Sequence, residues 1–156
     1  MKTQKCFLLS GLPGSGKSTW CKNYLKKHSK TLVISMDSLR EMLHADTYIF
    51  DKDLEPTIRF MTDSLIQHAI ETNRNIIIDE TNGTRCRREK LINIISDCDD
   101  RIKIICVVFK EGNNLKNRMK QPRGYTRQKW LEIICKMKHY WQPVTKTEGF
   151  DQIIKI

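Results

Sequence analysis

Residues 11–19 read Gly-Leu-Pro-Gly-Ser-Gly-Lys-Ser-Thr, and this stretch decides the fold. An apolar run, Cys6–Leu9, precedes it, and a stretch with helical spacing begins at about Lys17. In a strand–loop–helix context, the pattern G-x-x-x-x-G-K-[ST] is a phosphate-binding P-loop. Its glycines let successive backbone N–H groups face one anion, and the helix N-terminus adds partial positive charge. The motif therefore predicts that the chain binds a nucleoside triphosphate.

Two side chains of the loop have predicted roles in the chemistry. Lys17 bridges the β- and γ-phosphates of ATP or another nucleoside triphosphate, and the Ser18 hydroxyl ligates Mg²⁺. The alternative is a glycine-rich turn that binds nothing. The predicted cofactor-binding residues of the loop are Gly11, Pro13, Gly14, Ser15, Gly16, Lys17, Ser18 and Thr19.

Composition narrows the classes of partner. The chain has 156 residues and a net charge of +10, which favours polyanions, although a solvated lysine-rich surface has the same composition. Its six cysteines show no C-x-x-C spacing, and we expect free thiols in a reducing cytoplasm, whether the gene is cellular or from a phage. No apolar run approaches membrane-spanning length, so no membrane partner is expected.

Apolar runs alternate with helix-like segments along the whole chain. This alternation predicts a single three-layer α/β domain over residues 1–156, with a central, mainly parallel five-stranded sheet and a helical lid at about 116–126. The expected strands are Gln4–Ser10, Thr31–Ser35, Asn75–Asp79, Ile102–Phe109 and Phe150–Ile156. The expected helices begin at about Lys17, Asp37, Pro56, Arg85, Asn113 and Thr126.

Ligands of parallel sheets bind outside the carboxyl ends of the strands, so residues that follow each strand are expected to meet. Asp37 follows the second strand and is the predicted general base for an acceptor hydroxyl. It is also the predicted cap of the next helix. Arg40, one turn later, is predicted to grip an anionic group of the acceptor; a solvated surface arginine is the alternative.

Acidic and polar residues also follow the third strand. Asp79 is the predicted Mg²⁺ ligand, a role that Glu80 shares as an alternative. Thr81 and Asn82 are predicted to bind the acceptor, unless they are only turn residues. Cations at a helix start oppose its dipole, so Arg85 and Arg88 are predicted to contact polynucleotide phosphates, with surface solubility as the alternative.

Basic residues around a Pro-Arg-Gly turn predict the lid. Arg118 and Arg123 are expected to close over the triphosphate and stabilise charge on the transferring phosphoryl group. An ordinary helix–helix turn with exposed basic residues is the alternative.

Taken in order, these motifs resemble the kinase domain of bacteriophage-type polynucleotide 5'-hydroxyl kinases and their AAA_33-like P-loop relatives. The resemblance covers nearly the whole chain. The motifs that carry it are Gly11–Trp20, Asp37-x-x-Arg40, Asp79–Asn82 with Arg87 and Arg88, the lid from Arg118 to Arg123, and Glu148–Asp151.

This resemblance implies transfer of the ATP γ-phosphate to a 5'-hydroxyl end of DNA or RNA. By position it makes Asp37 the residue that activates the hydroxyl, Arg40 a contact of the acceptor phosphate, and Arg123 a lid residue on ATP. We expect any end-processing phosphatase or ligase to be a separate protein; the oligomeric state stays open. The alternatives are a kinase of another hydroxyl, such as a hydroxymethyl-pyrimidine in phage DNA or a nucleoside, and a non-catalytic ATP-binding nucleic-acid module.

Overall fold

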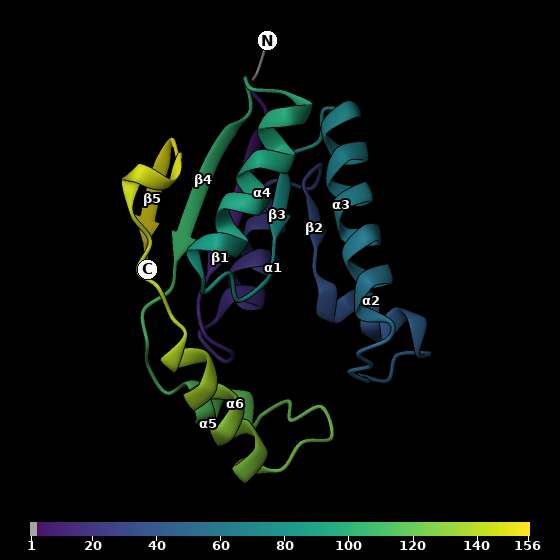
Figure 1. Ribbon diagram of the computed structural model, residues 1–156, viewed down its shortest axis with the longest axis vertical. Helices are drawn as coiled ribbons and strands as arrows, with labels where there is room; N and C mark the ends of the chain where they lie inside the picture. Colours follow the sequence, from purple (N-terminus) through teal and green to yellow (C-terminus); the bar gives the residue numbers. More distant parts are fainter. Residues whose placement is uncertain (1–2) are drawn as a thin grey trace.

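A five-stranded sheet forms the centre of the computed structural model, which describes residues 3–156 (Figure 1). All neighbouring strands pair in parallel in the order β2-β3-β1-β4-β5. The prediction of a mainly parallel sheet is therefore confirmed, and every strand pair in the described residues is parallel. The strands are β1 Lys5–Ser10, β2 Leu32–Ile34, β3 Ile76–Ile78, β4 Lys103–Val108 and β5 Gln152–Lys155.

Helices connect these strands and lie on both faces of the sheet. They are α1 Lys17–Lys27, α2 Met36–Leu43, α3 Glu55–Glu71, α4 Arg85–Cys98, α5 Asn114–Arg118 and α6 Arg127–His139, with a short 3-10 helix at Lys146–Glu148. The short 3-10 helix was not anticipated from the sequence. Thr126 caps α6 as expected, because its hydroxyl accepts a hydrogen bond from the Lys129 N–H at 3.1 Å.

Alternate residues of the strands divide the core into two layers. Leu8, Ile76 and Ile78 point to the face covered by α3 and α4, while Phe7 and Ile77 point to the face covered by α1. Strands of a parallel sheet are buried on both faces, which explains the uninterrupted apolar run of β3.

The segment predicted as the lid, at about 116–126, comprises the end of α5 and the turn that leads into α6. It lies beyond the carboxyl ends of β1 and β4, apart from the two core layers (Figure 1). Trp130 anchors the turn, since it is buried and its indole N–H donates to the Pro122 carbonyl at 2.8 Å. Within residues 3–156, no helix combines the length and apolarity needed to cross a bilayer.

Candidate active site

The P-loop joins β1 to α1 and has the backbone that a phosphate site requires. Gly14 and Gly16 have φ of 78° and 98°, in the left-handed region that favours glycine. A Cβ at Gly14 would also collide with the Asn114 carbonyl oxygen, and the Asn117 amide donates to the Gly14 carbonyl at 3.1 Å. Helix α5 of the lid is therefore seated directly on the loop.

Lys17 is held within this loop. Its ammonium donates to the carbonyls of Gly11 at 2.7 Å and Leu12 at 3.1 Å. Burial lowers the pKa of Lys17 to about 8, an effect that the carboxylates of Asp79 and Asp37 oppose. Bound phosphate groups would favour the charged ammonium, so the loop is electrostatically prepared for a polyanion.

The chemistry of a magnesium site is present beside the loop. The Ser18 hydroxyl donates to Asp79 Oδ2 at 2.8 Å, which brings together the two oxygen ligands predicted from the sequence. Glu80, the alternative ligand, is instead engaged by Arg87 at 3.1 Å, and burial raises the pKa of Glu80. Hydroxyl and carboxylate oxygens fit Mg²⁺, and the geometry favours Asp79 over Glu80.

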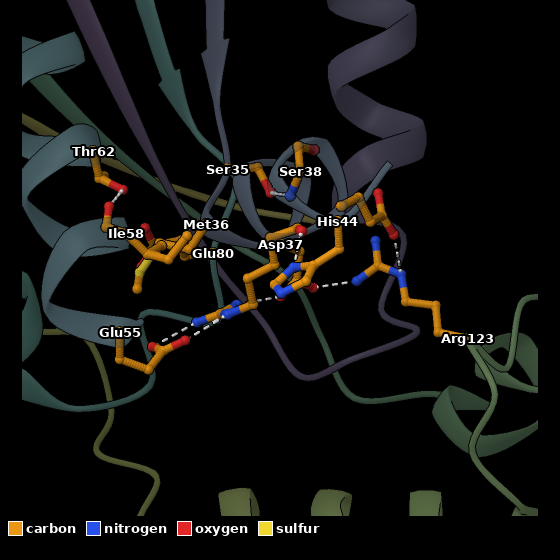
Figure 2. A network of polar contacts seen from close by, with 12 residues as sticks. Ser35, Met36, Asp37, Ser38, His44, Glu55, Ile58, Thr62, Glu80 and Arg123 are labelled. Atoms are coloured by element: carbon orange, nitrogen blue, oxygen red, sulfur yellow. Dashed lines mark hydrogen bonds and ion pairs between the residues drawn. The ribbon is translucent and has the colours of Figure 1, made fainter. Parts of the chain in front are cut away.

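Asp37 lies at the centre of a polar network shown in Figure 2. Its Oδ1 accepts from Arg40 Nη1 at 2.7 Å, and its Oδ2 accepts from Arg123 Nη1. The prediction that Asp37 caps α2 is wrong, because Ser35 is the cap and its hydroxyl accepts from the Ser38 N–H. The Asp37 carboxylate therefore does not cap the helix backbone, and 43% of the Asp37 side chain is exposed.

Arg40 is buried and holds Asp37 in place. Its Nε and Nη2 form a bidentate pair with Glu55 at 2.7 and 2.8 Å, while Nη1 binds Asp37. All three side-chain nitrogens are thus engaged, and contact with an acceptor phosphate stays a prediction for Arg40. Glu55 was not found from the sequence; the signal was a carboxylate in the first turn of α3, opposite the Asp37-x-x-Arg40 pair.

The two lid arginines differ in their surroundings. Arg123 pairs with Asp37 and with Glu41 at 3.0 Å, and its guanidinium lies 4.9 Å from the Tyr48 ring centre. Its action on ATP stays a prediction. Burial raises the pKa of Tyr48 to about 12, and the Asp37 charge adds to the effect. Arg123 also has a positive φ of 51°, a backbone conformation that non-glycine residues rarely adopt.

Arg118 packs over the Trp130 ring at 4.2 Å from its centre. Its Nε is buried, and within residues 3–156 it has no hydrogen-bond partner. Burial and the neighbouring charge of Arg123 lower the pKa of Arg118, and the Arg118 charge in turn depresses the pKa of Lys17. Among the described residues, Arg118 forms no ion pair, in contrast to Arg123, and its backbone adjoins Gly14 of the P-loop.

Two of the four residues after β3 that were predicted to contact the acceptor, Asn82 and Arg88, are buried. Asn82 is 3% exposed and donates to the Leu9 carbonyl at 2.8 Å. Arg88 is fully buried and pairs with Glu148 at 2.6 Å, with further bonds to three carbonyls. The predictions of acceptor contacts for Asn82 and Arg88 are wrong, because both side chains are buried and bonded within the protein, Asn82 to β1 and Arg88 to the C-terminal segment.

The other two predicted contacts after β3 remain accessible. Thr81 is partly buried, and its carbonyl accepts from the Gly11 N–H at 3.1 Å, which links β3 to the P-loop. Arg85 is exposed and pairs with Glu89 at 2.6 Å, one turn further along α4. A role for these two residues in acceptor binding stays a prediction.

A parallel sheet, a P-loop, a serine–aspartate pair beside it and an arginine-bearing lid define a kinase-type P-loop phosphotransferase. The chain belongs to the AAA domain family AAA_33, whose model matches residues 7–133. Members of P-loop kinase families bind nucleoside triphosphates with Mg²⁺. The resemblance to this family that the sequence motifs indicated is therefore confirmed.

Similar proteins occur both among curated sequences and among solved structures. L-seryl-tRNA(Sec) kinase from Methanococcus maripaludis is 30% identical over 121 residues, which cover 75% of this chain and 45% of that protein. A chain of the Pnkp1/Rnl/Hen1 RNA repair complex superposes with a TM-score of 0.73 at 20% identity, covering 97% of this chain and 47% of that one. A fungal RNA kinase superposes with a TM-score of 0.71 at 16% identity, covering 100% and 75%.

The structural matches show that the fold is shared, because their sequence identities are low. This chain spans less than half the length of the seryl-tRNA kinase and of the repair-complex chain.

Proposed function

We propose that this protein transfers the γ-phosphate of ATP to a 5'-hydroxyl end of DNA or RNA. The observation that carries the proposal is Asp37, a partly exposed carboxylate fixed by two arginines at the sheet edge that also bears the P-loop. The negative charge of Asp37 raises the pKa of Lys17, so the two groups are close enough to interact electrostatically. A nucleotide-binding module without catalysis has no use for a carboxylate held in this way.

The residues divide the reaction among them. The acceptor oxygen forms a bond to the γ-phosphorus as its proton passes to Asp37, and the bond to the β–γ bridging oxygen breaks, leaving ADP. Lys17 and the loop N–H groups hold the phosphates, and Arg118 offsets charge on the transferring group. Mg²⁺, held by Ser18 and Asp79, would neutralise negative charge on the β- and γ-phosphates.

Two features support a nucleic-acid acceptor. The net charge of +10 favours binding to a phosphate backbone. The names of the curated relative, the repair complex and the fungal kinase all include an RNA. Arg85 and Thr81, which flank the β3–α4 turn, are the proposed acceptor contacts, and Arg40 joins them if its Glu55 pair opens.

A second candidate follows from the identity with L-seryl-tRNA(Sec) kinase. Here the acceptor hydroxyl would not be the 5' end of a strand but a hydroxyl attached elsewhere on an RNA. A hydroxymethyl-pyrimidine or a nucleoside belongs to the same group of alternatives. Asp37 would have the same role in each case, so only the acceptor separates them.

The test is transfer of labelled γ-phosphate from ATP with Mg²⁺ to a panel of acceptors. The panel contains 5'-hydroxyl DNA and RNA oligonucleotides, their 5'-phosphorylated controls, seryl-tRNA, hydroxymethyluracil DNA and free nucleosides. We expect label on the 5'-hydroxyl strands alone. Label only on seryl-tRNA, modified DNA or nucleosides would overturn end phosphorylation and leave the role of Asp37 intact, and an Asp37→Asn variant with full activity would overturn both.

A further inference from the structure

Three rings form a row along α1, away from the residues assigned to catalysis. Trp20 stacks on Tyr24 with ring centres 5.1 Å apart and planes at 25°, and Tyr24 lies 4.3 Å from the His28 ring at 31°. The spacing of four residues puts Trp20 and Tyr24 on the same side of α1. The ring of His28, which caps the C-terminus of the helix, continues the row beside Tyr24. We call Trp20, Tyr24 and His28 the aromatic ladder.

The rings of the ladder are only partly buried in the hydrophobic core. Trp20 and Tyr24 pack on Phe7 of β1 at 5.8 and 5.0 Å between ring centres, yet both remain partly exposed, and His28 is exposed. A shallow hollow of about 420 Å³ lies beside the rings. It is lined by Trp20, Asn23, Tyr24, Lys26, Lys27 and His28.

The charge of the molecule is concentrated on this part of the chain. Residues 1–36 contain seven lysines and no acidic residue, and so carry +7 of the net +10. Lys22, Lys26, Lys27 and Lys30 lie on or directly after α1, and all four are exposed. None of these four lysines forms an ion pair with a described residue, whereas Arg40, Arg88 and Arg123 each pair with a carboxylate.

We propose that the aromatic ladder and the lysines beside it form a docking surface for single-stranded nucleic acid. Bases stack on the ladder, which ends in the exposed His28 ring, while Lys26 and Lys27 contact the phosphates. The surface lies on the α1 face of the sheet, opposite α3 and α4, and shares no residue with the phosphotransfer site. It therefore does not depend on which hydroxyl the protein phosphorylates.

The rings distinguish this partner from other polyanions. Polyglutamate or a sulfated polysaccharide would be attracted by the lysines but has no aromatic group to stack on Trp20, Tyr24 or His28. A single strand offers both a phosphate at every nucleotide and a base that stacks without sequence preference. A nucleic acid can use both the aligned rings and the unpaired lysines, whereas a polyanion without aromatic groups can use only the lysines.

The first experiment measures binding of a labelled, 5'-phosphorylated oligothymidylate by fluorescence anisotropy, without ATP, over a range of salt concentrations. This strand has no 5'-hydroxyl, so phosphotransfer does not contribute. For Lys26→Ala/Lys27→Ala we expect the slope of log affinity against log salt to fall by about 1.4, because each lost phosphate contact of a single strand removes about 0.7. The matched control, Arg59→Ala/Arg74→Ala, removes two exposed charges from α3 and the turn after it, and is expected to leave the slope unchanged.

The second experiment tests stacking. His28→Ala is expected to weaken binding of the oligothymidylate about fivefold or more, and His28→Trp to restore it, since aromatic groups contribute roughly 1–3 kcal/mol per stacked base. A strand of the same length without bases should bind more weakly and be insensitive to His28→Ala. Equal effects of the two double variants, or equal binding of the base-free strand, polyglutamate and oligothymidylate, would overturn the proposal.

Discussion

This protein contains two networks in which arginines pair with carboxylates, and the two networks differ in how far solvent reaches their carboxylates. In one, Arg88 of α4 and Glu148 are both fully buried and paired at 2.6 Å, and further Arg88 donors bind backbone carbonyls. In the other, Asp37 is bound by Arg40 and Arg123, yet 43% of its side chain is exposed. Both sets of arginines were predicted to bind phosphates.

The difference lies in what each network leaves unsatisfied. A desolvated pair with every donor bonded has no capacity left for a ligand, so Arg88 and Glu148 serve to fix the C-terminal segment against α4. A carboxylate oxygen has more than one lone pair, so Asp37 retains capacity for a hydroxyl beside its two arginines. Residue type drew attention to the arginines of both networks, but solvent access is what distinguishes the structural network from the one that can bind a ligand.

The largest expected effect is on catalysis at Asp37. Asp37→Asn keeps the shape and the Arg40 contact but removes the proton acceptor, so the rate of phosphate transfer should fall by roughly 10²- to 10⁴-fold. Single-turnover transfer from labelled ATP measures the rate, and ATP affinity measured by calorimetry is the control. A variant that transfers phosphate at the wild-type rate would mean that the exposed network is structural as well.

Arg88→Met is the corresponding change in the buried network. It leaves the Glu148 carboxylate buried without its partner, so the free energy of unfolding should fall by about 3–5 kcal/mol, as measured by urea denaturation. Replacing both members, in Arg88→Met/Glu148→Leu, should recover part of the loss because no charge is then stranded. If Arg88→Met instead kept its stability and lost acceptor binding, Arg88 would belong to the phosphate-binding class.

A smaller effect distinguishes the lid arginines. Arg118→Ala should raise the KM for ATP by about 10- to 100-fold, since a hydrogen bond to a charged group contributes roughly 1.5–3 kcal/mol. Arg123→Ala should affect it less, because Arg123 pairs with Asp37 and Glu41 and lies outside the P-loop contacts. The reverse order would mean that the lid rearranges on binding ATP and moves Arg123 onto the phosphates.

The fold followed from patterns that act over short stretches of sequence. Strands of apolar residues such as Ile76–Ile78, the P-loop glycines and the Thr126 cap each specify local structure, and their order specifies a parallel sheet. The 3-10 helix at Lys146–Glu148 escaped prediction although a local signal is present, the capping box between Thr145 and Glu148. The pairing of Glu148 with Arg88, by contrast, is a tertiary contact that no local pattern indicates.

The site was predicted less completely, for the same reason. The predicted proximity of Asp79 and Ser18 is correct. It could be derived from the sequence because each residue follows one of two adjacent parallel strands. Glu55 was missed and Arg88 was misassigned because partner choice depends on distances between segments 15 and 60 residues apart. Sequence patterns indicate which groups reach the sheet edge, and not which of them neutralise one another.

A pH titration tests the electrostatics of the P-loop. Lys17 has a pKa lowered to about 8 by burial, whereas bound phosphates favour its charged form. ATP affinity should therefore be constant below pH 7 and fall by about tenfold between pH 7 and 9, as the free protein loses the proton. Lys17→Arg, if it still binds ATP, should show no such fall, because arginine stays charged throughout this range.

The smallest expected effect concerns Arg85, which belongs to neither network. It is exposed and its guanidinium pairs with Glu89 on the same helix, so Arg85→Ala should leave the thermal midpoint unchanged. If Arg85 contacts an acceptor phosphate, the salt dependence of 5'-hydroxyl strand binding should weaken by about 0.7 in slope while kcat is preserved. An unchanged slope would assign Arg85 to the solvated surface and leave Thr81 and Arg40 as the proposed acceptor contacts. Because its stability effect is negligible, Arg85 reports phosphate binding alone, which Arg40 cannot do while it is paired with Glu55 and Asp37.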